Sequence, residues 1–151
     1  MEHVEGNEFV CDTCGTVKDI LTGEIRDPEA EEIQKGWIGV DLDGTLAIYD
    51  GWKGIEHIGE PILPMVDRVK QWIADGRDVR IMTARVSEQS LKANSVYLDA
   101  IVAPIQRWCL KHIGYKLPVT CKKDLEMIEL WDDRCVQVIP NTGQRADGKQ
   151  T

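Results

Sequence analysis

From Trp37 onward the chain alternates between short apolar runs and longer amphipathic segments, and this alternation limits the fold more than any other feature. Apolar runs of this kind suit strands buried in a parallel sheet, and the segments between them suit helices packed against it. The runs cover residues 37–40, 79–82, 117–120, 127–131 and 136–139, and the helical segments cover residues 64–75 and 87–112. The pattern predicts an α/β fold with a Rossmann-like parallel sheet and helices on both faces.

Prolines and glycines predict where the helices begin and end. Pro64 suits the first turn of a helix, and Gly76 suits the end of the same helix. Pro104 lies within the second helical segment, where it removes a backbone donor, so we expect it to kink that helix or divide it in two.

Gly36 is predicted to mark a domain boundary. The segment before it, residues 1–36, is acidic, and its residues 27–35 are predicted to be helical. Residues 37–140 are predicted to form the main folded domain. Residues 141–151 are polar and contain two glycines, which predicts a flexible tail.

The net charge of −8 is concentrated near the N-terminus. Residues 1–36 hold ten acids and three bases, a net charge of −7, whereas residues 37–151 hold sixteen acids and fifteen bases, a net charge of −1. A surface for duplex nucleic acid is usually basic, so duplex binding is not expected, although a single nucleotide fits. The chain has no long apolar stretch and no secretory signal, which predicts a cytoplasmic protein with no membrane span.

Cys11 and Cys14 have the spacing of half a zinc ribbon. A structural zinc site needs four ligands, and the sequence holds no second pair of this spacing. His3 could be a third ligand, or a homo-oligomer could supply a second pair of cysteines. Zinc binding and a knuckle without metal both remain open.

Acidic pairs follow two of the predicted strands. Asp41 and Asp43 come directly after residues 37–40, and Asp132 and Asp133 come directly after residues 127–131. The carboxyl ends of parallel strands meet at one edge of a sheet, so the four carboxylates are expected near one another. Carboxylate oxygens with water and phosphate are the ligands that Mg²⁺ prefers, and an ionised aspartate is a nucleophile towards phosphorus.

Other polar residues at strand ends could bind a phosphoryl group. Thr83 follows the second strand, and Lys123 or Lys122 follows the third. A threonine hydroxyl can donate to a phosphate oxygen, and a lysine can neutralise charge during phosphoryl transfer. Gly44 allows a sharp turn after the first acidic pair, and the Thr45 hydroxyl follows it, so both are candidate substrate-binding residues.

These motifs together resemble the four-motif signature of the haloacid dehalogenase superfamily. The resemblance is carried by Asp41-Leu42-Asp43-Gly44-Thr45, Ile81-Met82-Thr83, the lysine and Asp132-Asp133, over about two thirds of the chain. It implies an aspartyl-phosphate on Asp41, acid/base catalysis by Asp43, and phosphoryl binding by Thr83 and Lys123. It also implies Mg²⁺ binding by Asp41, the backbone carbonyl of Asp43 and Asp132, supported by Asp133.

The spacing of the motifs resembles small members without a cap domain, of the kind found among bacterial and phage proteins. Between Asp43 and Thr83 there is room for one helix and a flap hairpin over residues 46–58. The flap carries Tyr49 and Trp52, which could stack on a base or pack within the hairpin. Arg85 could contact substrate or form a structural ion pair.

The expected function is therefore Mg²⁺-dependent hydrolysis of a phosphomonoester, with a nucleotide or another small phosphorylated metabolite as substrate. One alternative is a phosphatase of polynucleotide 3′ ends. Another is a non-catalytic binding or regulatory module that recruits a partner through the N-terminal knuckle.

Overall fold

The computed structural model describes residues 2–5, 8–11, 17–19, 25–26 and 35–150 of the chain. The chain divides into two compact units, Met1–Ile33 and Gln34–Thr151. Within the described residues, no helix is long and apolar enough to cross a membrane.

The first unit contains a small antiparallel sheet with the strand order β1-β2-β3-β4. Its strands are β1 (Glu2–Glu5), β2 (Glu8–Cys11), β3 (Val17–Asp19) and β4 (Ile25–Arg26). The sequence did not predict these strands. The predicted helix over residues 27–35 falls almost entirely outside the described residues, as do Cys14 and the side chain of Cys11, so zinc binding stays a prediction.

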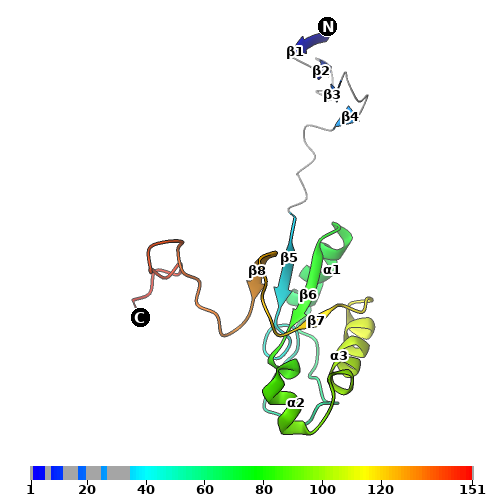
Figure 1. Cartoon of the computed structure of the whole chain (residues 1–151), viewed down its shortest axis with the longest axis vertical. Helices are drawn as coiled ribbons and strands as arrows, with labels where there is room; N and C mark the ends of the chain where they lie inside the picture. Colours follow the sequence, from blue (N-terminus) through cyan, green and yellow to red (C-terminus); the bar gives the residue numbers. More distant parts are fainter. Residues whose placement is uncertain (1, 6–7, 12–16, 20–24, 27–34, 151) are drawn as a thin grey trace. The chain divides into compact units, whose positions relative to one another are not determined.

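The second unit is built on a four-stranded sheet in which every pair of neighbouring strands is parallel. Its strand order is β7-β6-β5-β8, so β5 has a partner on each side (Figure 1). The strands are β5 (Trp37–Val40), β6 (Asp78–Met82), β7 (Val119–Thr120) and β8 (Met127–Trp131). The predicted α/β class, its parallel sheet and the first four strands are confirmed.

Helix α1 (Leu63–Ala74) connects β5 to β6, and it confirms the predicted helix. Pro64 lies in its first turn, where no backbone donor is required. Gly76, with a positive φ of 79°, ends it, and the Gly76 amide donates to the Ile73 carbonyl over 3.0 Å.

The second helical segment is divided, but not at Pro104. It forms a 3-10 turn η1 (Ala84–Val86), helix α2 (Glu88–Asn94) and helix α3 (Leu98–His112). The division falls at Ser95, which adopts a left-handed conformation with φ of 53°. Pro104 instead lies inside α3 with its ring buried in the core, where apolar packing offsets the missing backbone hydrogen bond.

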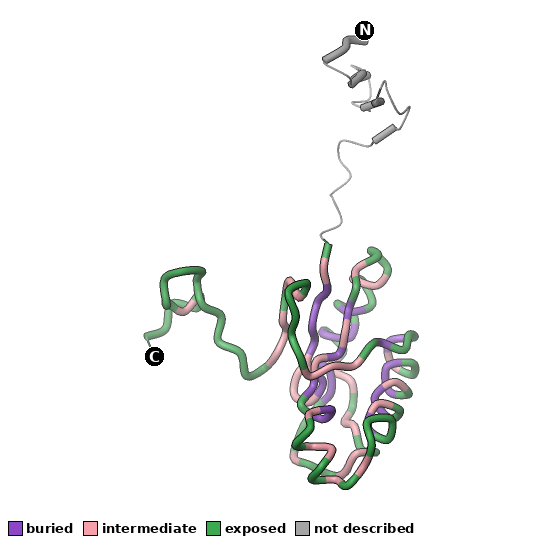
Figure 2. Tube along the Cα trace, in the orientation of Figure 1, coloured by how far each residue is buried: buried purple, intermediate pink, exposed green. Residues whose placement is uncertain are grey.

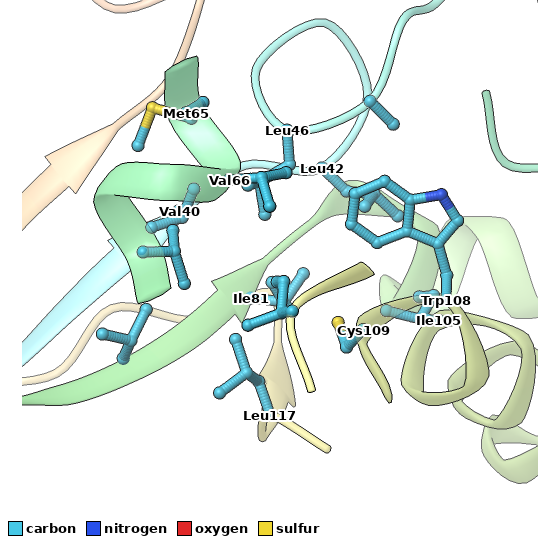
Figure 3. Packing of buried hydrophobic residues seen from close by; sticks show 14 of the residues in the cluster. Val40, Leu42, Leu46, Met65, Val66, Ile81, Ile105, Trp108, Cys109 and Leu117 are labelled. Carbon is cyan, nitrogen blue, oxygen red and sulfur yellow. The ribbon is translucent and has the colours of Figure 1, made fainter. Parts of the chain in front are cut away.

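The core lies between the sheet and two of these helices. Ile38 and Val40 of β5 are in register with Val79 and Ile81 of β6, so the four side chains share one face. Residues of α1 and α3 cover that same face in one continuous cluster, and Figure 3 shows Ile81 between them. The helical members of the cluster that are most fully buried are Val66, Val69, Ile101, Ile105 and Cys109. Figure 2 shows β5 buried along its length.

The expected arrangement of helices on both faces differs from the one observed. In the second unit, α1 and α3 both lie over the face of Ile38 and Val79. The connections from β5 to β6 and from β6 to β7 run in one direction along the sheet. Because connections between parallel strands are as a rule right-handed, their helices lie on one side. The connection from β7 to β8 spans only residues 121–126, which is too short for a helix to cover the other face.

The predicted fifth strand is wrong. Residues 136–139 do not join the sheet, and Val136, Val138 and Ile139 are 51%, 50% and 42% exposed. The segment turns back on itself instead, because the Ile139 amide donates to the Gln144 carbonyl over 2.8 Å. An alternating apolar run predicted a strand here, but only tertiary pairing could have placed it in the sheet.

The predicted flap is a loop closed at its base rather than a hairpin with regular strands. Its two ends are joined by backbone hydrogen bonds from Ile48 to Glu60 (2.9 Å) and from Ile62 to Leu46 (2.7 Å). The loop therefore extends to residue 62, four residues beyond the predicted end.

We expect Ile81→Ala to lower the free energy of unfolding by about 2–5 kcal/mol, because it leaves a cavity in the core. The control Ile139→Ala removes an exposed side chain and should change it by less than about 0.5 kcal/mol. Chemical denaturation of both variants measures the difference. A loss for Ile139→Ala as large as that for Ile81→Ala would contradict the described arrangement of residues 136–139.

Candidate active site

Polar residues gather at the carboxyl edge of the parallel sheet. Asp41 directly follows β5, Thr83 follows β6, and Asp132 follows β8. The hydrogen bonds of the sheet continue into this edge. The Asp41 amide donates to the Trp131 carbonyl and the Thr83 amide donates to the Thr120 carbonyl, each over 2.8 Å. The backbones of Asp41 and Thr83 are therefore held by the neighbouring strand, which fixes where their side chains begin.

Three carboxylates meet at this edge. Oxygens of Asp41, Asp132 and Asp133 all lie within 4.8 Å of one another. Partial burial and the neighbouring charge of Asp132 raise the pKa of Asp41 from 3.8 to about 7, and a hydrogen bond with the Asp133 carboxyl adds to the shift. A bound cation would relieve this repulsion, and an all-oxygen donor set is the kind that Mg²⁺ takes.

Aromatic packing fixes the end of β8 just before these aspartates. The Trp131 ring contacts the edge of Trp72 from α1, with ring centroids 5.2 Å apart. The Arg68 guanidinium lies over the same ring at 4.8 Å. Since Trp131 precedes Asp132 directly, these contacts help to hold the acidic pair in place.

Gly44 leaves space for the Asp133 side chain and Thr45 binds Asp133, and neither Gly44 nor Thr45 lines the pocket. A Cβ on Gly44 would lie 2.7 Å from Asp133 Oδ2, and Gly44 has a positive φ of 89°, so both space and conformation favour glycine. The Thr45 hydroxyl donates to Asp133 Oδ1 over 3.3 Å and accepts from the Asp133 amide over 3.1 Å. The predicted contact of these two residues with substrate remains a prediction.

Asp43 forms a bidentate ion pair with Arg85. Nε and Nη2 of Arg85 donate to the two carboxylate oxygens of Asp43, each over 2.7 Å. The Arg85 side chain is only 5% exposed. Nη2 also donates to the His57 carbonyl over 3.0 Å, and the guanidinium lies 4.9 Å from the centroid of the Trp52 ring. Arg85 thus forms a buried ion pair and also lines the pocket, so its two predicted roles are compatible.

Thr83 is buried at the start of the turn η1. Its side-chain oxygen accepts a hydrogen bond from the Arg85 amide over 3.2 Å. A hydroxyl that accepts one hydrogen bond can still donate its proton, so Thr83 can donate to an oxygen in the pocket that it lines.

Both candidate lysines are exposed, and neither lines this pocket. The backbone amide of Lys122 donates to the Thr120 side chain over 3.1 Å, which shapes the turn after β7. The cationic residues that line the pocket are Arg85 and Arg134. The choice between Lys123 and Lys122 stays open.

An open pocket of about 1010 Å³ lies over this edge. Asp41, Asp43 and Asp132 line it together with Tyr49 and Trp52 from the flap. Sequence reasoning missed other lining residues that follow β6, β7 and β8, namely Ser87, Gln89, Ser90, Ala93, Asn94, Cys121 and Arg134. Their places after strands that end at this edge were the available signal, but ordinary hydroxyl and amide residues carry no recognisable motif.

No protein family, curated protein or solved structure matches this chain. The chemistry of the site therefore carries the functional inference. Its main elements are three clustered carboxylates, a fourth carboxylate paired with a buried arginine, a buried hydroxyl and an open pocket.

We expect Asp41→Asn to raise the melting temperature of the metal-free protein by a few degrees at about pH 8. Because the folded-state pKa of Asp41 is raised to about 7, the carboxylate is charged above that pH at a cost to the folded state. Its protonated form fits the fold, so the benefit of the substitution should shrink as the pH falls below 7 and vanish near 4. Thermal unfolding in a chelator over this pH range measures the effect.

Asp67→Asn is the matched control, because Asp67 is an exposed aspartate on α1 outside the pocket. It should not reproduce the pH-dependent gain. Equal gains for Asp41→Asn and Asp67→Asn would show that the effect reflects overall charge instead of the carboxylate cluster.

Proposed function

We propose that this protein hydrolyses phosphomonoesters with Mg²⁺ through an aspartyl-phosphate on Asp41, as a capless member of the haloacid dehalogenase superfamily. The observation that carries the proposal is the cluster of Asp41, Asp132 and Asp133 at the carboxyl ends of adjacent parallel strands. Structural carboxylates are usually paired with bases, whereas these three face one another, an arrangement that a cation stabilises.

The donor atoms fit Mg²⁺. Asp41 and Asp132 would bind it with the backbone carbonyl of Asp43, and Asp133 would support the site, held by Thr45. The ion would supply positive charge that neutralises the phosphoryl oxygens. The positive charge of a bound Mg²⁺ would offset the burial and the neighbouring negative charge that raise the pKa of Asp41, which favours the ionised nucleophile.

The first half of the reaction transfers the phosphoryl group to Asp41. A carboxylate oxygen of Asp41 forms a bond to phosphorus while the bond from phosphorus to the ester oxygen breaks. Asp43 gives a proton to that leaving oxygen, so an alcohol departs. The Thr83 hydroxyl donates to a phosphoryl oxygen and stabilises the charge that builds up on it.

The second half returns Asp41 to its starting state. Asp43, now a carboxylate, takes a proton from a water molecule as the water oxygen bonds to phosphorus. The bond from phosphorus to Asp41 breaks, inorganic phosphate leaves, and Asp43 again holds the proton for the next cycle. In this scheme Lys123 or Lys122 would contact the transferring phosphoryl group, and Arg134 is a further cation at the pocket.

A nucleotide or a similar small metabolite is the favoured substrate. The pocket is open, and its lining includes Tyr49 and Trp52 from the flap and the neutral polar side chains of Gln89 and Ser90 from α2. Aromatic rings can stack on a base, and amide or hydroxyl groups can bond to its edge or to a sugar. A polynucleotide 3′ end needs an extended basic track, which the near-neutral charge of residues 37–151 does not favour. The non-catalytic alternative leaves the three facing carboxylates without a role.

We expect the purified protein to release phosphate from at least one member of a substrate panel when Mg²⁺ is present. The panel contains p-nitrophenyl phosphate, nucleoside monophosphates, sugar phosphates and 3′-phosphorylated oligonucleotides. Asp41→Asn should lower the turnover by about 1,000-fold or more, because an amide cannot replace the nucleophile. Asp67→Asn serves as the control and should keep normal turnover.

Two results would contradict the proposal. One is a complete lack of phosphate release from the whole panel with Mg²⁺ present. The other is full activity of Asp41→Asn. Preference for the oligonucleotides over nucleoside monophosphates would favour the alternative of an end-processing phosphatase.

A further inference from the structure

We propose that Arg85 is the positioning residue for Asp43, holding this carboxylate in the orientation that proton transfer to the leaving group requires. This inference rests on the proposed function. In this role Arg85 acts through Asp43. It neither binds the phosphate directly nor serves only to stabilise the fold.

The first support is the fork geometry of the pair. Both oxygens of Asp43 accept from Arg85, each over 2.7 Å, so the carboxylate plane is fixed relative to the guanidinium plane. Each carboxylate oxygen has a second lone pair, so Asp43 can take up a proton on the pocket side while both hydrogen bonds from Arg85 are kept. A single hydrogen bond would leave the carboxylate free to rotate.

The second support is that Arg85 is itself fixed from several directions. Its side chain is 5% exposed, its Nη2 donates to the His57 carbonyl over 3.0 Å, and its amide donates to the Thr83 side chain over 3.2 Å. The Trp52 ring lies 4.9 Å from the guanidinium. Arg85 therefore links the end of β6 with the flap, and Asp43 takes its orientation from both.

The third support is an unsatisfied donor. Nη1 of Arg85 is buried and has no hydrogen-bond partner within the described residues. A buried donor without a partner costs stability, so each one in a folded protein calls for an explanation. The ion pair thus keeps a costly cation beside Asp43, which a purely structural role would not require.

Arg80 provides a matched control within the same chain. Nε and Nη2 of Arg80 also bind both oxygens of an aspartate, Asp78, and its guanidinium lies 4.8 Å from the centroid of the Trp37 ring. This second arginine–aspartate–tryptophan group does not line the pocket. Comparing the same substitution at Arg85 and Arg80 therefore separates the effect of losing a bidentate ion pair from the effect of losing the orientation of Asp43.

The test compares kcat/KM for two aryl phosphates of similar shape, p-nitrophenyl phosphate and phenyl phosphate. Nitrophenolate leaves readily without a proton, whereas phenolate needs one. Since kcat/KM reports the steps up to the first irreversible one, it reports phosphoryl transfer to Asp41 apart from release of the product. A loss of proton donation must therefore be larger for phenyl phosphate.

We expect Arg85→Gln to lower kcat/KM about 100-fold for phenyl phosphate and less than about tenfold for p-nitrophenyl phosphate. Asp43→Asn should show the same dependence on the leaving group. The double variant should be no worse than the more impaired single variant, because both substitutions remove one function. Arg80→Gln should leave both rates unchanged.

Equal losses on the two esters for Arg85→Gln would overturn the inference, because a lost phosphate contact or a damaged fold acts on both alike. Losses that multiply in the double variant would overturn it as well.

If Arg85→Gln does not fold, Arg85→Lys keeps the positive charge without the bidentate geometry, and its kcat/KM values for the two esters are compared in the same way. If the wild-type protein hydrolyses neither ester nor any other panel member, the proposed function itself fails. If it is active and depends on Asp41, only the role of Arg85 is in question.

Discussion

Parallel pairing of β5 with a strand on each side is the constraint on which the candidate site depends. It brings the ends of β5, β6 and β8 to one edge, so residues far apart in the sequence become neighbours. The backbone hydrogen bonds of Asp41 with Trp131 and of Thr83 with Thr120 extend this pairing into the site. The same strand pairing is stabilised by apolar contacts with α1 and α3, made by Ile38, Val40, Val79 and Ile81. The core and the candidate site therefore depend on the same strands.

Electrostatics divides the four aspartates into two kinds. Asp41 faces Asp132 and Asp133, and burial together with this like charge raises its pKa. Asp43 lies only two residues away but faces Arg85, which binds both of its oxygens. Two carboxylates of one short motif therefore meet opposite environments, one facing like charge and the other facing a cation.

Several sequence expectations failed where long-range contacts decide the outcome. Residues 136–139 have the alternating apolar pattern of a strand, yet the Ile139 amide bonds to the Gln144 carbonyl of the segment that follows them. Pro104 has the chemistry of a helix breaker, yet burial in the core keeps it inside α3, and Ser95 makes the break. The role of Lys122 or Lys123 stays a prediction, and the cationic side chains that line the pocket are those of Arg85 and Arg134.

The sequence by itself determined the α/β class, the first four strands of the sheet, helix α1, and the edge at which the acidic residues gather. These features follow from local periodicity and from the rule that parallel strands end at one edge. Only the tertiary structure decided that α1 and α3 share one face, that Thr45 binds Asp133, and that Arg85 binds Asp43. Those outcomes depend on how distant segments approach one another, and neither spacing nor residue type encodes that approach.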